Sequence, residues 1–188
     1  MKKTVMLAFF LFSIAIIGCS SDPAANLPAE DEVPVASQEV ETMTSLTLTS
    51  PAFQDNGDIP AKYTCQGDDI NPELVIGGIP AETKTLALIM DDPDAPVGVW
   101  VHWVEYNIAP TASIPEAAGK VGDQGLNSWK KTGYAGPCPP SGKHRYIFKI
   151  YALDTELTIK NPDKTAVEAA MEGHVLAQVK LTGLYEKI

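Results

Sequence analysis

The sequence predicts a mainly β fold, a β-sandwich that carries one or two short helices. Short apolar runs rich in Val, Ile, Trp and Tyr recur through residues 44–188. Connections rich in Pro and Gly separate these runs, and only one segment, late in the chain, has the spacing of an amphipathic helix. Many short strands with turn residues between them are typical of a two-sheet sandwich.

Five segments are predicted to be strands, and their patterns differ. Residues 45–49 and 175–185 alternate between polar and apolar side chains, which indicates strands with one buried face. Residues 84–90 form a nearly continuous apolar run, which indicates a strand buried on both faces. Residues 99–108 and 145–153 are rich in β-branched and aromatic side chains, which favour strands.

One helix is predicted after the triplet Asn161-Pro162-Asp163, which can cap and start it. Gly173 is expected to mark its end, and His174 to lie where a cation interacts favourably with the helix dipole. A second short helical turn is predicted at residues 115–120. The helix face expected to be buried carries Val167, Ala170, Met171 and His174.

Residues 1–18 are predicted to be a signal peptide. Lys2 and Lys3 precede an apolar stretch, residues 4–17, that is too short to span a bilayer as a helix. The stretch ends at Gly18-Cys19 and resembles a bacterial lipoprotein signal, which implies cleavage before Cys19 and acylation of Cys19. Ser20 then favours the outer membrane, facing the periplasm, as the place in the cell envelope. An ordinary signal peptide with an incidental cysteine is the alternative.

Residues 19–43 are predicted to be a flexible tether, and 44–188 one globular domain. The tether has acidic residues, three prolines and no Lys, Arg or aromatic residue, so it cannot bury enough apolar surface to order itself. The whole chain has 14 Lys and Arg against 24 Asp and Glu, and loss of Lys2 and Lys3 leaves 12 against 24. This acidic balance argues against nucleic acid as a partner. It also argues against a basic membrane-binding surface, so membrane attachment would rest on the lipid anchor.

Cys65 and Cys138 are the cysteines that remain after Cys19. Disulfides persist in export compartments, so a bridge between the two is possible. Two separate, packed thiols are equally compatible with the sequence, because geometry decides.

Three polar clusters are candidates for a functional site. The first, residues 91–96, is Asp-Asp-Pro-Asp-Ala-Pro, and the second, residues 100–103, is Trp-Val-His-Trp. Strand alternation predicts Trp100 and His102 on one face and Val101 and Trp103 on the other. The third, residues 133–146, is a loop rich in Gly and Pro that ends in His-Arg-Tyr and contains the only arginine of the chain. Taken singly, these clusters are better explained as an acidic turn, a core histidine and a structural Pro-rich turn.

Taken together and in this order, the clusters resemble the phosphatidylethanolamine-binding protein family, in the bacterial branch called Raf-kinase-inhibitor-like proteins. The resemblance rests on Asp-Pro-Asp-Ala-Pro at 92–96, His-Trp at 102–103 and Gly-Pro-Cys-Pro-Pro-Ser-Gly-Lys-His-Arg-Tyr at 136–146. It extends over essentially the whole globular region. It implies a sandwich with a small cavity at one end that accepts phosphate, phosphoryl head groups or small carboxylates, with no cofactor.

Carried over by motif, the ligand pocket would be formed by Asp92, His102, Pro139, Pro140, His144 and Tyr146. Asp94 would support the loop by pairing with Arg145, which suits a bidentate salt bridge. Trp100 would form part of the mouth.

The chemistry of these side chains fits an anion. The two histidines and the Tyr146 hydroxyl can donate hydrogen bonds, and backbone N–H groups of Ser141 and Gly142 can add more. Asp92 fits only if it orients a histidine, meets a protonated phosphate or meets an ammonium group such as that of ethanolamine. If the histidines donate, acidification should tighten phosphate binding.

The leading functional hypothesis is a non-catalytic binding or inhibitor module. It would act on an envelope protein, for example a protease. One alternative is a hydrolase that uses Asp92, His102, His144 and Ser141, although no Gly-x-Ser-x-Gly elbow is present. A metal site of His102, His144 and Asp92 is a third possibility, which the spacing does not require.

Overall fold

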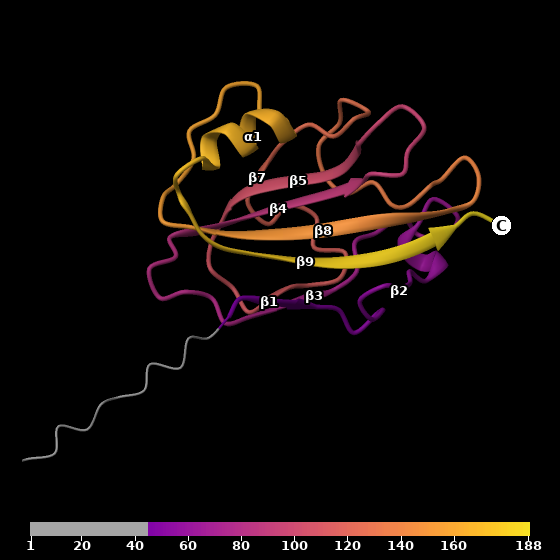
Figure 1. Ribbon diagram of the computed structural model, residues 1–188, viewed down its shortest axis with the longest axis horizontal. Helices are drawn as coiled ribbons and strands as arrows, with labels where there is room; N and C mark the ends of the chain where they lie inside the picture. The colour runs from indigo at the N-terminus through magenta and orange to yellow at the C-terminus, as the bar shows by residue number, and fades with distance from the viewer. Residues whose placement is uncertain (1–44) are drawn as a thin grey trace, which may run out of the picture. The chain divides into compact units, whose positions relative to one another are not determined.

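The computed structural model describes residues 45–188. The predicted signal peptide, the tether and Cys19 lie outside the described residues. Two β-sheets pack against each other, and one helix covers the outer face of the larger sheet (Figure 1). The mainly β fold predicted from the sequence is confirmed.

The smaller sheet has three antiparallel strands in the order β1-β3-β6. They are β1 (Thr47–Thr49), β3 (Leu74–Gly77) and β6 (Ser113–Ile114). The larger sheet has six strands in the order β2-β9-β8-β4-β5-β7, and only the β2–β9 pair is parallel. Its strands are β2 (Gly57–Asp58), β4 (Thr85–Asp92), β5 (Trp100–Ile108), β7 (Asp123–Gln124), β8 (Lys143–Leu153) and β9 (Val175–Glu186).

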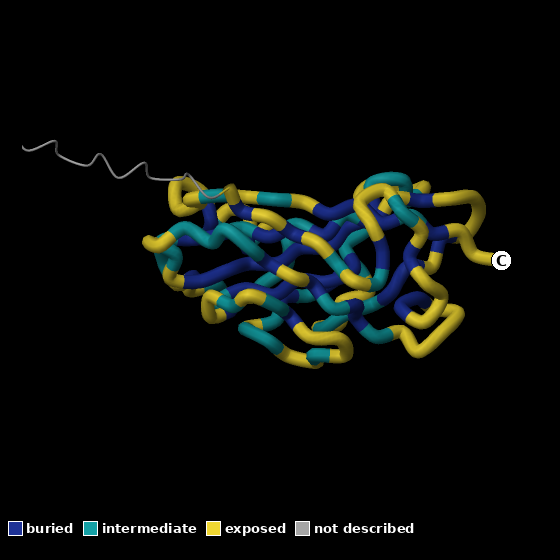
Figure 2. Tube along the Cα trace, turned by 90° about the horizontal axis from the view of Figure 1, so that it is seen from below, coloured by how far each residue is buried: buried dark blue, intermediate teal, exposed yellow. Residues whose placement is uncertain are grey.

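Strand β4 is the centre of the molecule, since every one of its residues is buried. Leu88 and Met90 pack between the two sheets, whereas Ala87 and Ile89 pack toward the helix. This explains the apolar run at 84–90, because a strand covered on both faces needs apolar side chains at every position. Buried segments run through the middle of the domain and exposed loops surround them (Figure 2).

Helix α1 (Lys164–Met171) begins as the sequence predicts. The Asp163 carboxylate accepts a hydrogen bond from the backbone N–H of Ala166 at 3.0 Å, and Val167 and Met171 are buried. The helix ends before His174, which lies beyond it and has its Nδ1 2.8 Å from the Asp154 carboxylate. The expected place of His174 on the buried helix face is therefore wrong, since the residue is exposed, whereas its backbone N–H donates to the carbonyl of Met171 at the helix end.

The helical turn expected at residues 115–120 is wrong. Ala117 and Gly119 have positive φ angles of 51° and 66°, which interrupt a right-handed helix. The short helix besides α1 in the described region is a 3-10 turn, η1, at Ala61–Tyr63.

Glu105 is a carboxylate buried without any exposed surface in β5. One of its oxygens accepts hydrogen bonds from the Trp103 indole at 3.1 Å and the Gln124 amide at 2.8 Å. The other accepts from the backbone N–H groups of Gly122 and Val121 at 3.1 and 3.4 Å. Four donors therefore surround this carboxylate and hold residues 121–124 against β5.

Candidate functional site

The site lies at one end of the large sheet, where β4 ends and where β5 and β8 begin (Figure 1). Because β4 is antiparallel to both neighbours, Asp92 faces Trp100, and Asp91 faces Ile147 near the start of β8. A cavity of about 210 Å³ opens here. Its lining consists of Asp92, Ala95, Pro96, Val97, Trp100, His102, Trp129, Cys138 and Pro140.

A β-bulge in β5 positions His102. Met90 pairs with Trp103 and Asp91 pairs with Val101, so His102 is an extra residue on β5. The bulge breaks the alternation, since Trp103 packs between the sheets whereas Val101 packs on the helix side. The expectation that Val101 and Trp103 share a face is therefore wrong. Bulges of this kind redirect a side chain, and here the redirected side chain is a cavity residue.

His102 is held in one tautomer by its surroundings. Its Nδ1 lies 2.6 Å from the carbonyl oxygen of Ala135, and a carbonyl can only accept, so Nδ1 carries the hydrogen. The ring meets the rings of Tyr146 and Trp129 edge-on at 5.2 and 5.1 Å. Burial lowers the pKa of His102, partly opposed by the Ala135 carbonyl and Asp92. The imidazole is thus favoured as the neutral form, with its lone pair on Nε2.

Asp92 and His144 form a buried pair. The carboxylate oxygen Oδ2 lies 2.8 Å from Nδ1 of His144, and Oδ1 accepts a hydrogen bond from the backbone N–H of Asp94 at 2.8 Å. Of these two residues, only Asp92 lines the cavity. His144 lies behind it and fixes the orientation of the carboxylate.

Tyr146 packs against His102 and near Asp92 with an unsatisfied hydroxyl, but it is not part of the cavity lining. The residue is fully buried, and its oxygen has no hydrogen-bond partner in the described region. Asp92 and the backbone amide of Cys138 are its polar neighbours. Burial, followed by the charge of Asp92, raises the pKa of Tyr146, so the hydroxyl keeps its proton. A buried polar group without a partner is costly unless a ligand or water satisfies it.

The Pro-rich loop is fixed by a disulfide between Cys138 and Cys65, whose Cα atoms are 5.5 Å apart. The alternative of two separate thiols is excluded. Pro140 lines the cavity and Pro139 is buried beside it. Ser141 and Gly142, which were expected to offer backbone N–H groups, are exposed and not part of the lining.

Arg145 binds Asp94 in a bidentate pair outside the cavity. Its Nε and Nη2 donate to the two Asp94 carboxylate oxygens at 2.9 and 2.6 Å, and its backbone N–H donates to one of them at 2.9 Å. These bonds lower the pKa of Asp94 to about 2. Their stabilising effect is present above the ordinary Asp pKa and is lost as the pH falls toward about 2.

Replacing Arg145 with Lys should weaken the fold slightly and leave ligand affinity within about twofold, because lysine cannot form the bidentate pair and the residue lies outside the lining. Thermal unfolding at about pH 7 and pH 3 checks the first part, and the difference between the variant and the parent protein should shrink at the lower pH. Lost affinity with unchanged stability would place Arg145 in the pocket.

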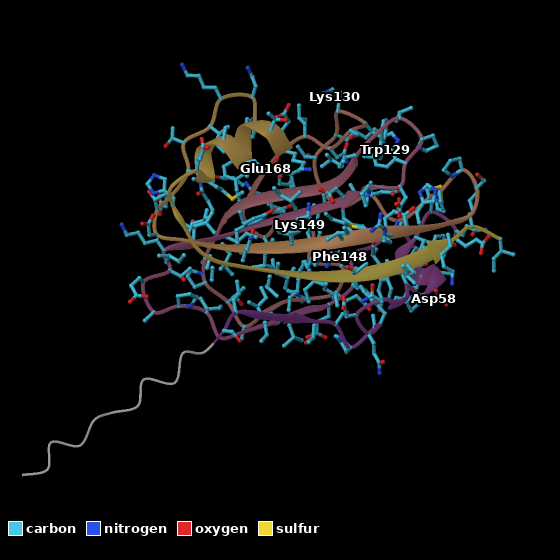
Figure 3. All side chains as sticks on the ribbon, viewed as in Figure 1. Asp58, Trp129, Lys130, Phe148, Lys149 and Glu168 are labelled. Atoms are coloured by element: carbon cyan, nitrogen blue, oxygen red, sulfur yellow. A yellow bond between two sulfur atoms is a disulfide. The ribbon has the colours of Figure 1, made fainter. Side chains whose placement is uncertain are left out.

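Trp129 and Val97 were missed in the sequence. Trp129 is 42% exposed and packs edge-on against Trp100 at 5.3 Å. It lies toward the cavity end of the sheet (Figure 3). Val97 is 78% exposed at the cavity wall. A tryptophan in a polar loop is a signal for a site residue. Its packing against Trp100 could not be predicted, because the two residues are distant along the chain.

Two further observations concern residues 45–188. No group of three His, Cys, Asp or Glu side chains is arranged to hold a metal ion in this part of the chain. No helix in the same part has the length and apolar character needed to cross a membrane.

Comparison with known sequences gives a consistent result. The sequence model of a family described as phosphatidylethanolamine-binding protein matches residues 49–186. A UPF0098 protein from Methanothermobacter thermautotrophicus is 50% identical over 151 residues, covering 76% of this chain and 99% of that protein. A UPF0098 protein from Chlamydia muridarum is 46% identical over 149 residues, covering 76% and 99%.

Solved structures agree with the sequences. A crystal structure of a protein from Chlamydia trachomatis, described as a homologue of phosphatidylethanolamine-binding protein, has a TM-score of 0.75 at 43% identity. That of Escherichia coli YbcL, described as a new member of the mammalian family of these proteins, has a TM-score of 0.70 at 29% identity. Each comparison covers 77% of this chain and 99% of the solved one.

Proposed function

The chain belongs to the phosphatidylethanolamine-binding protein family, and from this premise we propose that its end cavity binds a small anion, either phosphate or a phosphoryl head group. The observation that carries the proposal is the buried Tyr146 hydroxyl, which lies beside Asp92 and has no hydrogen-bond partner among residues 45–188, although Tyr146 itself is not part of the cavity lining. A ligand oxygen is the partner that this hydroxyl lacks. The cavity of about 210 Å³ limits the ligand to a small group.

The proposal includes a regulatory role. Val97 and Trp129 give the mouth an exposed apolar rim, which suits contact with another protein. We propose that the bound anion modulates this contact, and that the partner is an envelope protein such as a protease. The predicted lipid anchor at Cys19 would hold the protein at the outer membrane, facing the periplasm.

A hydrolase is the weaker candidate. The Asp92–His144 pair has the spacing of a catalytic dyad. Ser141, the suggested nucleophile, makes no hydrogen bond to His102 or His144 in the described region and is exposed. The pair is better explained as the support of the cavity carboxylate.

Isothermal titration of the purified chain with phosphate and with phosphoethanolamine tests the binding. Tyr146→Phe should weaken it by about tenfold or more, since a hydrogen bond to a charged group is worth roughly 1.5–3 kcal/mol. Tyr151→Phe is the matched control, because Tyr151 lies on the same strand but packs toward the helix. Equal affinity in both variants would contradict the role of Tyr146. Tighter binding of phosphoethanolamine would indicate that Asp92 meets the ammonium group.

A further inference from the structure

The cavity offers more hydrogen-bond acceptors than an anion site needs. Asp92 is 3% exposed and carries a carboxylate into the lining. Nε2 of His102 is a second acceptor, because Nδ1 of the same ring already donates to the Ala135 carbonyl. The Tyr146 hydroxyl can donate or accept. Asp92 and His102 therefore present two acceptors in the lining, whereas the side-chain donors near them are the indole N–H groups of Trp100 and Trp129 and the neighbouring Tyr146 hydroxyl.

No cation in the described region compensates for these acceptors. The lining contains neither Lys nor Arg. Arg145 is engaged by Asp94, and Lys143 lies 2.8 Å from Asp58 away from the cavity. A fully deprotonated oxyanion would place its oxygens against Asp92 and Nε2 of His102 with no hydrogen between them.

We infer that the pocket selects oxyanions that still carry a proton, so that it binds phosphate and phosphate monoesters and rejects sulfate. This inference rests on the proposed anion binding. A P–OH group can donate to Asp92 or to Nε2 of His102 while the other phosphate oxygens accept from Tyr146. Sulfate has the same shape and, near pH 8, the same charge as hydrogen phosphate, but it has no hydrogen to donate.

The dependence on pH follows from the groups around these two residues. Inorganic phosphate carries one proton at about pH 8 and takes up a second near neutral pH, whereas a phosphate monoester takes up its one proton near about pH 6, so acidification adds a donor in both cases. Burial lowers the pKa of His102, which favours the neutral imidazole with its acceptor at Nε2. The titratable and charged groups that face the two residues are His144 and Tyr146 on β8, Asp69 in the loop after η1, and the Asp94–Arg145 pair.

The test is titration of the full chain with inorganic phosphate and with sulfate, each at about pH 8 and about pH 6 and at constant ionic strength. Phosphate should bind about tenfold or more tightly than sulfate already at pH 8. The reason is that hydrogen phosphate donates a hydrogen bond to a buried acceptor, which sulfate leaves unsatisfied. Its affinity should rise further at pH 6. Equal affinities for the two anions would overturn the inference and leave the proposed anion binding intact. No binding of either anion would overturn both.

The variant Asp92→Asn tests whether Asp92 causes the preference for phosphate over sulfate. The amide can donate to an oxyanion, so the preference for phosphate should fall to within about threefold, mainly through tighter sulfate binding. Asp58→Asn removes the same charge at an exposed position outside the cavity and should keep the preference. A preference unchanged in Asp92→Asn would refute the role of Asp92. The comparison of anions in the parent protein decides the inference even if this variant folds poorly.

Discussion

Replacing both Cys65 and Cys138 with alanine is expected to lower the free energy of unfolding by about 2–4 kcal/mol. The two cysteines are 73 residues apart in the sequence, so the bridge removes a large amount of freedom from the unfolded chain. It also ties the cavity loop to η1 and to the segment that follows η1. Two hydrogen bonds join the same parts of the chain, from the Gly136 N–H to Asp69 and from the Tyr134 hydroxyl to the Tyr63 carbonyl. Urea denaturation of the variant and of the parent protein measures the difference.

The parent protein reduced with dithiothreitol is the matched control for this prediction. It keeps both side chains and lacks only the cross-link, so its unfolding midpoint should fall to nearly that of the double variant. A variant within about 0.5 kcal/mol of the oxidised parent would show that the bridge adds little to the fold. Because Cys138 lines the cavity, phosphate affinity should fall along with stability.

Replacing Glu105 with Gln is expected to destabilise the protein by about 2–4 kcal/mol. The carboxylate accepts hydrogen bonds from four donors, two at each oxygen. A glutamine has one acceptor oxygen, so in either orientation its NH₂ group faces two of those donors and leaves them unsatisfied in the interior, at a cost of about 1–3 kcal/mol each.

Chemical denaturation checks this prediction, with Glu168→Gln as the control at a position whose side chain is 43% exposed. The control should change stability by less than about 0.5 kcal/mol. If the two variants unfold at the same denaturant concentration, the four donors do not depend on the charge of Glu105.

The central strands could be predicted because their patterns are local. The apolar run at 84–90 and the aromatic segment at 145–153 correspond to β4 and β8, whose side chains meet the core at the expected spacing. The two-residue strands β2, β6 and β7 could not be found, since a pair of residues carries no period. The same holds for the turn at 115–120, where Ala117 adopts a positive φ that composition does not reveal.

The candidate site could likewise be predicted only in part. The sequence motifs pointed to Asp92, His102 and Pro140, and the structure places all three in the cavity wall. The bulge at His102 could not be predicted, because it is defined by the pairing of β5 with β4. The position of His144 behind Asp92, and of Trp129 in front of His102, depends equally on contacts between distant segments.

The placement of the cavity at the ends of β4, β5 and β8 has a kinetic consequence. Its walls come together only after three strands have paired, so a partly folded chain contains no binding site. A bound anion would then stabilise the native state without helping earlier species to form. The bound anion would slow unfolding rather than speed folding. Occupancy of the cavity would therefore lengthen the lifetime of each folded molecule.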